Sequence, residues 1–173
     1  TYDPHPQLSK DNPNVYMSMG ITAENVAKKF NISRKEQQDF AISSHSKANL
    51  ARESNLFDNE IVSITNNDEK INKDGGIRPN TSHEILDGLK LAFDENGTVT
   101  AGTASPLTDG ASAVIVCEEE YAKKNNLNIL ARIKSTAVVG CPPELMGLGP
   151  INASKKALKR ANLSISDIDI VEL

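Results

Sequence analysis

The stretch GTVTAGTASPLTDGASAVIV, residues 97–116, brings glycine, alanine and short hydroxyl residues together in a turn next to an apolar segment. Gly97, Gly102 and Gly110 lack a Cβ, so another group can come close to the backbone there. The threonine and serine hydroxyls of such a turn lie beside backbone amides. Composition alone leaves two interpretations open: the turn admits a ligand, or it is a buried loop whose small residues fit under neighbouring elements.

The chain before this turn is polar and predicted to be mainly helical. Three prolines and a glycine within residues 1–20 make regular structure unexpected before Thr22, the predicted N-cap of a helix over residues 23–30. Ser33 and Glu36 have the spacing of a capping box, which predicts a longer helix that begins there and ends near residue 55.

The segment between that helix and the turn contains a second set of local signals. Residues 59–64 are predicted to form a short strand, and the polar residues 65–76 after it an exposed loop. Thr81 and Glu84 suggest another capping box. Arg78 comes just before it, where it is either a solvated charge or a cation that shares an anion with a helix N-terminus.

After the turn, apolar and amphipathic segments alternate. Residues 111–117, 129–139 and 168–171 are predicted strands, the first of them a continuous apolar run of the kind buried on both faces. Residues 118–124 and 153–161 are predicted helices. Strands and helices that alternate in this way predict an α/β domain with a sheet layered between helices.

Composition restricts the class of protein. The 173 residues are 38% hydrophobic, enough for one domain, and no segment has the roughly 18 consecutive apolar residues of a membrane span. A net charge of −4 without a basic stripe argues against nucleic-acid binding. The two cysteines stand apart, which favours a cytoplasmic protein. Because the chain opens on Thr1 and stops in a predicted strand, we expect it to be part of a longer protein.

A catalytic set cannot be assembled from these residues. Ser105 has no GxSxG frame around it, and structural thiols are the better interpretation of Cys117, at the end of an apolar strand, and of Cys141, before two prolines. His45 lies within a predicted helix without other ligands at metal spacing, so a packed or solvated ring is favoured over a ligand. We therefore expect no catalytic residue and no metal site.

Four segments resemble successive parts of the thiolases, in the order in which that family has them. They are MGITAENVAKKFNISRKEQQDFAISSHSKA (19–48), GIRPNTS (76–82), the turn at 97–116, and AVVGCPPELMGLGPINASKKALKRANLSISDIDIVEL (137–173). Together they cover nearly the whole chain. The sequences of the segments AGTAS and VVGCPPELMGLGP are most similar to those of bacterial 3-ketoacyl-CoA thiolases. They are also similar to those of acetoacetyl-CoA thiolases.

The resemblance implies a partial, thiolase-like layered αβαβα fold with an inserted, mainly helical loop domain. Residues 1–96 would be the loop domain that faces coenzyme A. Residues 97–124 would be the last strand and helix of the N-terminal thiolase domain, and residues 125–173 the truncated start of the C-terminal domain.

The resemblance also implies a role for five residues. Ala101, Ser105 and Leu107 match the turn that lies along the pantetheine arm of coenzyme A. Arg78 matches an arginine that faces the nucleotide end, and Met146 a residue that borders the acyl pocket. Coenzyme A and acyl-CoA would be substrates, and no bound cofactor is expected.

The implied activity is acyl transfer between 3-ketoacyl-CoA, or acetoacetyl-CoA, and coenzyme A through a cysteine thioester. The nucleophilic cysteine and the histidine of the family match no position here, so the isolated chain is expected to be inactive. A full-length protein would be a homodimer or homotetramer in the cytoplasm. A non-catalytic thiolase-like lipid-binding or scaffold protein is the alternative.

Overall fold

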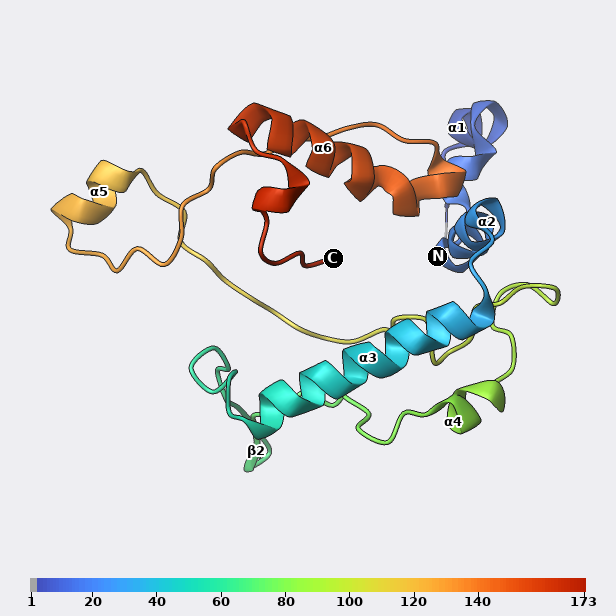
Figure 1. Cartoon of the computed structure of the whole chain (residues 1–173), viewed down its shortest axis with the longest axis horizontal. Coiled ribbons are helices and arrows are strands. Elements are labelled where there is room, and N and C mark those ends of the chain that lie inside the picture. The colour runs from blue at the N-terminus through green and yellow to red at the C-terminus, as the bar shows by residue number, and fades with distance from the viewer. Residues whose placement is uncertain (1–2) are drawn as a thin grey trace. The chain divides into compact units, whose positions relative to one another are not determined.

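The computed structural model describes residues 3–173 and divides the chain into two compact units, Thr1–Pro106 and Leu107–Leu173 (Figure 1). The first unit holds, in order, α1 (Pro6–Asp11), the 3-10 helix η1 (Pro13–Tyr16), α2 (Met19–Phe30), α3 (Arg34–Glu53), β1 (Ile64–Asn66), β2 (Glu69–Ile71) and α4 (His83–Asp87). The second holds α5 (Glu119–Lys124), the 3-10 helix η2 (Pro143–Leu148), α6 (Gly149–Ala161) and the 3-10 helix η3 (Ile165–Asp167).

The N-terminal segment is more regular than its proline content predicts. Two short helices form within it, and Pro6 and Pro13 each occupy the start of one, where the fixed φ of proline favours a helix. The predicted cap at Thr22 is wrong, because Ser18 caps α2 by accepting a hydrogen bond from the backbone N–H of Ile21. Thr22 instead lies buried within the helix.

The capping box at the start of α3 is confirmed. The Ser33 hydroxyl accepts from the backbone N–H of Glu36, whose carboxylate accepts from the Ser33 backbone N–H at 2.7 Å. The helix ends at Glu53, two residues before the predicted end. α3 is the long cyan helix of the first unit (Figure 1).

The predicted start of α4 is wrong by one residue. Ser82, and not Thr81, caps the helix by accepting from the backbone N–H of Ile85. The Thr81 hydroxyl donates instead to the carbonyl of Arg78 at 2.8 Å, which closes the turn before the helix. A hydroxyl on either of two adjacent residues could supply the cap, so the pattern alone could not choose between them.

A small β-hairpin replaces the predicted strand at residues 59–64 and part of the loop after it. β1 and β2 pair antiparallel, and Ile64 lies opposite Ile71. Asn67 and Asp68 between them have φ values of 48° and 65°, as a two-residue type I′ turn requires. Asparagine and aspartate tolerate positive φ, and this allows the chain to reverse here.

In the second unit the predicted helices are present and the predicted strands are not. α5 matches residues 118–124, and α6 includes residues 153–161 but begins at Gly149. Residues 111–117, 129–139 and 168–171 form no strand, since a strand needs a hydrogen-bonded neighbour and none pairs with them within the described chain.

The apolar side chains of these segments are accordingly exposed. Val114 and Ile115 are 87% and 88% exposed, so the expectation of a strand buried on both faces is not met in this chain. The alternation of apolar segments and helices is that of an α/β domain, but the described residues contain only the β1–β2 pair as a sheet. Of the predicted helix and sheet layers, the described chain therefore contains the helices but not the sheet of the second unit.

Candidate functional site

The turn after Gly97 is held at its start by α2 and α3. The carboxylate of Glu24, on α2, accepts the backbone N–H of Val99 at 2.7 Å and that of Thr98 at 2.9 Å. The Thr98 hydroxyl donates to the same carboxylate and accepts from the side-chain amide of Gln37 on α3 at 2.7 Å. A Cβ on Gly97 would collide with the Glu24 carboxylate, so a side chain there would displace that carboxylate from the position in which it accepts the two N–H groups.

Thr100 organises the turn itself. It is fully buried, and its carbonyl accepts from the backbone N–H groups of Thr103 and Ala104 at 3.1 and 3.0 Å. Its hydroxyl accepts from Gly102, and its own N–H donates to the Thr103 hydroxyl. These bonds satisfy the backbone locally and fix the shape of the tip without help from the exposed residues.

The two sides of the turn differ in burial. Gly102 lies against α4 and the residues after it: a Cβ there would clash with Leu86 and would be 2.7 Å from Cδ1 of Leu89. Ala101 and Ser105 are exposed on the same turn. One side of the turn is thus packed under neighbouring side chains, as a buried loop would be, and the other side is exposed; the binding of a ligand there stays a prediction.

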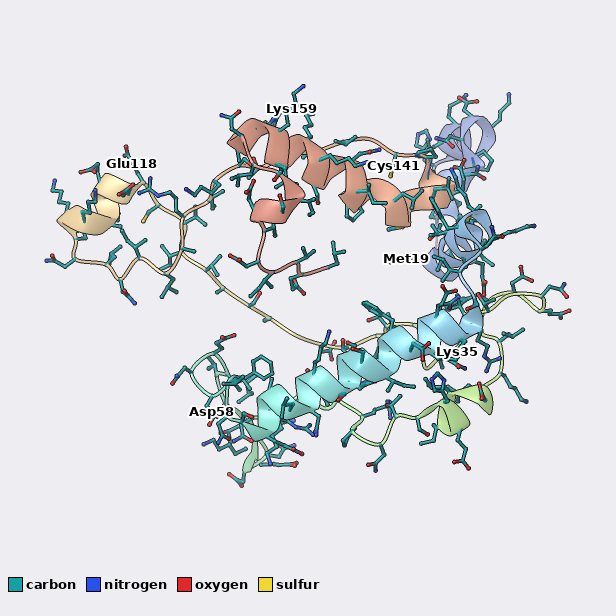
Figure 2. All side chains as sticks on the ribbon, in the orientation of Figure 1. Met19, Lys35, Asp58, Glu118, Cys141 and Lys159 are labelled. Carbon is teal, nitrogen blue, oxygen red and sulfur yellow. The ribbon has the colours of Figure 1, made fainter. Side chains whose placement is uncertain are left out.

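The other predicted residues fall in different places. The exposed Ser105 hydroxyl donates a long hydrogen bond of 3.5 Å to the Pro106 carbonyl oxygen. Leu107 is fully exposed and begins the second unit. Met146 lies in η2 of that unit and is 42% exposed. Cys141 Sγ is 3.9 Å from the Met146 carbonyl oxygen, near the start of α6 (Figure 2).

Arg78 combines an anchored backbone with an exposed side chain. Its N–H donates to Nδ1 of His45 on α3 at 3.2 Å, and its carbonyl accepts from the hydroxyl and the N–H of Thr81. Its guanidinium has no partner among the residues that the structure describes. The sequence did not indicate the contact with His45, because 33 residues separate the two positions.

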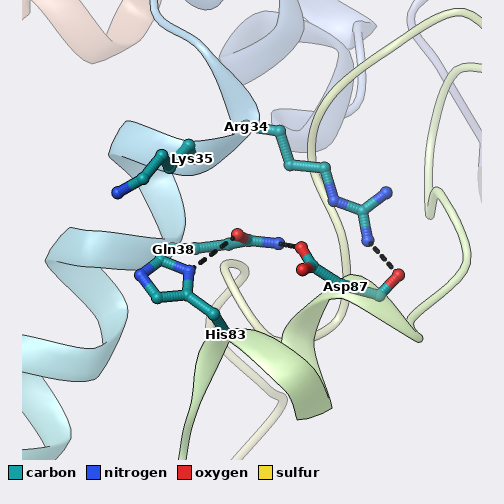
Figure 3. A pocket seen from close by; sticks show the side chains of 5 residues that line it. All are labelled: Arg34, Lys35, Gln38, His83 and Asp87. Carbon is teal, nitrogen blue, oxygen red and sulfur yellow. Dashed lines mark hydrogen bonds between the residues drawn. The ribbon is translucent and has the colours of Figure 1, made fainter.

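A pocket of about 390 Å³ lies beside the contact of α3 with α4 (Figure 3). The residues that line it are Arg34, Lys35, Gln38, His83 and Asp87. Gln38, a residue only 2% exposed, lies between Asp87 and His83. Its side-chain amide donates to Asp87 at 3.0 Å, and its side-chain oxygen lies 3.2 Å from Nδ1 of His83. No motif in the sequence pointed to this cluster.

The charged groups around the pocket bind neighbouring side chains or the backbone. Asp39 is 2.8 Å from the ammonium of Lys35 and 2.7 Å from Nε2 of His83, and the Lys35 contact first and then His83 lower the pKa of this carboxyl. Arg34 donates to the carbonyls of Leu86, Asp87 and Leu89 at 2.8 to 3.1 Å. These interactions fasten α4 to α3, so we assign the cluster a structural role.

Other kinds of site are not indicated in the part of the chain that the structure describes. Residues 3–173 contain no group of three His, Cys, Asp or Glu side chains that could hold a metal ion. Cys117 is exposed and Cys141 half-buried, and each is a free thiol. Among the same residues, no helix has the length and apolar character needed to cross a membrane.

Comparison with protein families gives two matches. Residues 8–120 match the model of the thiolase N-terminal domain, and residues 127–173 match that of the thiolase C-terminal domain. Among curated relatives, the 3-ketoacyl-CoA thiolases of Serratia proteamaculans and Marinobacter nauticus are 49% and 47% identical over 99% of this chain. The chain spans 46% of the length of each, about half of these relatives.

Solved structures agree with these matches. The dimeric peroxisomal thiolase of Saccharomyces cerevisiae superposes with a TM-score of 0.92 at 40% identity, over 98% of this chain and 44% of its own. The human mitochondrial 3-ketoacyl-CoA thiolase in complex with CoA gives 0.88 at 40% identity, over 94% and 41%. The expected partial thiolase fold is thereby confirmed, and this chain belongs to the thiolase family.

Proposed function

We propose that this chain is part of a thiolase that transfers an acyl group between 3-ketoacyl-CoA, or acetoacetyl-CoA, and coenzyme A. Identity of 49% to a 3-ketoacyl-CoA thiolase supports the reaction class. The observation that carries the proposal is the turn at residues 98–105, which Glu24 and Thr100 hold rigid while Ala101 and Ser105 remain exposed. A hydrogen-bonded tip with an exposed hydroxyl that makes only one long hydrogen bond suits a ligand that passes along it.

Within this proposal, five residues contact the substrates. Ala101, Ser105 and Leu107 lie along the pantetheine arm, and Met146 borders the acyl group. Arg78 binds the nucleotide end of coenzyme A, because a guanidinium donates to phosphate oxygens in a fixed, paired geometry. An exposed guanidinium on an anchored backbone supports that assignment, since the backbone of Arg78 is already ordered before the anion binds.

The rest of the protein supplies the chemistry. We place no catalytic residue in this chain and assign residues 1–96 to the loop domain, 97–124 to the N-terminal domain and 125–173 to the C-terminal domain. The human relative was solved in complex with CoA, and the yeast relative is dimeric, which supports coenzyme A as a ligand and a homodimer, or a homotetramer built from such dimers, as the assembly. We place the protein in the cytoplasm, where it takes part in fatty-acid metabolism by β-oxidation.

The substitution Arg78→Ala in the full-length protein tests the proposal. Loss of a charged hydrogen bond to phosphate costs about 1 to 3 kcal/mol, so the KM for coenzyme A should rise roughly 5- to 150-fold with little change in kcat. Lys47→Ala is the matched control: it removes the same charge from an exposed position on α3. An unchanged KM for coenzyme A and for acyl-CoA in Arg78→Ala would show that the assignment of Arg78 is wrong.

A further inference from the structure

We propose that His45 is a positioning residue for Arg78: it holds the backbone of the segment before α4 so that the guanidinium is presented to its anion. The proposal rests on the proposed function of Arg78 in coenzyme A binding. It adds a residue on another element, whose side chain acts only through the backbone of the segment that carries Arg78.

The geometry of the segment supports this role. Residues 72–75, after β2, are exposed, and the contacts of Gly76 with Asp74 and of Thr81 with Arg78 are local to the segment. The bond from the Arg78 N–H to Nδ1 of His45 ties the segment to α3, across 33 residues of sequence. Among the hydrogen bonds of the described residues, this is the one that joins residues 72–81 to another helix or strand.

The chemistry of the bond assigns the roles of its two atoms. A backbone N–H can only donate, so Nδ1 of His45 is the acceptor in this bond. His45 is half-buried on a regular stretch of α3, where its own helix limits its movement and makes it a fixed acceptor.

Arg34 is an arginine whose side chain has a structural role, and it can be compared with Arg78. Its guanidinium donates to three carbonyl oxygens at the end of α4, and no part of that task falls on its backbone. In Arg78 the arrangement is reversed: the backbone N–H and carbonyl are bound and the guanidinium is not. This contrast indicates that the structure holds Arg78 in place for an external ligand.

Two substitutions at position 45 separate the acceptor from the helix. His45→Asn places Oδ1 on Cγ, the atom that carries Nδ1 in histidine, so the acceptor is kept. His45→Leu removes the acceptor, although leucine is the better helix former. If position 45 served only the stability of α3, the leucine variant would be the less perturbed of the two.

The first measurement is amide hydrogen exchange in the full-length protein without ligand, on peptides that contain residue 78. Loss of one net hydrogen bond should speed exchange at Arg78 roughly 2- to 12-fold in His45→Leu, and His45→Asn should stay near the wild type. Lys47→Ala, on a different face of α3, is the control and should not change this exchange. Equal exchange in the leucine variant and the wild type overturns the proposal.

The second measurement is the KM for coenzyme A. His45→Leu should raise KM by a similar factor and leave kcat unchanged, and His45→Asn should restore KM. If Arg78→Ala raises KM but His45→Leu does not, His45 does not position Arg78. If Arg78→Ala itself leaves KM unchanged, the proposed function of Arg78 fails, and the exchange rates still decide whether His45 fixes this backbone.

Discussion

Glu24 accepts the backbone N–H of Val99 at 2.7 Å, although the two residues stand 75 positions apart in the chain. Both are buried, at 7% and 5% exposure, and the same carboxylate also accepts the N–H of Thr98. A carboxylate that accepts two backbone N–H groups replaces the water that they lose on burial. The first turns of α2 therefore determine where the candidate coenzyme A turn begins.

Glu24→Gln should destabilise the protein and loosen this turn. The amide keeps one oxygen, which at the position of Oε1 still accepts from Val99 and Thr98, but its NH₂ group takes the place of Oε2 and faces the Thr98 N–H, one donor against another. The donor–donor contact, together with the loss of the charge that strengthens these bonds, costs about 1 to 3 kcal/mol. Urea denaturation of the full-length protein should show a lower midpoint for Glu24→Gln than for Glu95→Gln, which removes the same charge from an exposed loop position. Equal midpoints in the two variants would mean that the carboxylate is not needed.

Local signals in the sequence were sufficient to predict the helices with strong caps. Ser33 and Glu36 are three residues apart, and both hydrogen bonds of their capping box lie within one turn of helix. The start of α2 could not be predicted in this way, because Ser18 and Thr22 are both acceptable caps. The choice between them depends on packing, which places Thr22 in the core. The local sequence therefore identifies candidate N-caps, and tertiary packing decides which of them begins the helix.

The strands and the contacts of the site depend on distant residues. An apolar run such as residues 111–117 becomes a strand only when a neighbouring strand accepts its hydrogen bonds, and none does so within the described chain. The bonds from Glu24 to Val99 and from His45 to Arg78 link positions far apart in sequence. Resemblance to a family indicated Ala101, Ser105 and Arg78 as site residues. Neither that resemblance nor the local sequence indicated that Glu24 and His45 hold these segments in place.

The capping box of α3 should make stability depend on acidity through Glu36. Hydrogen bonds from the hydroxyl and then the backbone N–H of Ser33 lower the pKa of this carboxyl below its ordinary value of 4.5. A lowered folded pKa means that the ionised form is favoured by folding. The contribution is therefore complete above the unfolded pKa and is lost as the pH falls from 4.5 through the lowered value.

Glu36→Gln isolates this effect, because glutamine completes a capping box but does not titrate. The difference in urea midpoint between the wild type and Glu36→Gln should stay constant above pH 4.5 and shrink below it. In Ser33→Ala, where the hydroxyl donor is missing, the carboxyl resonance of Glu36 should titrate at a higher pH than in the wild type. An identical titration in both proteins would contradict the role of Ser33.

Gly102→Ala tests whether the packed side of the turn controls its exposed side. A Cβ at this position would clash with Cδ2 of Leu86, a residue 3% exposed, and would be 2.7 Å from Cδ1 of Leu89, so these leucine side chains, the turn or α4 must shift. Overpacking of this kind costs about 1 to 3 kcal/mol. Because Ala101 adjoins Gly102, the KM for coenzyme A should rise together with the loss of stability.

Gly75→Ala is the matched control for this substitution, since nothing lies within 4 Å of a Cβ built at Gly75 and its φ is not positive. That variant should unfold at the same urea concentration as the wild type or slightly above it, because alanine reduces the freedom of the unfolded chain. A Gly102→Ala protein that keeps both its stability and its KM would show that the close contact with Leu86 relaxes without displacing the turn. The hydrogen bonds of Glu24 and Thr100 would then be sufficient to hold Ala101 and Ser105 in position.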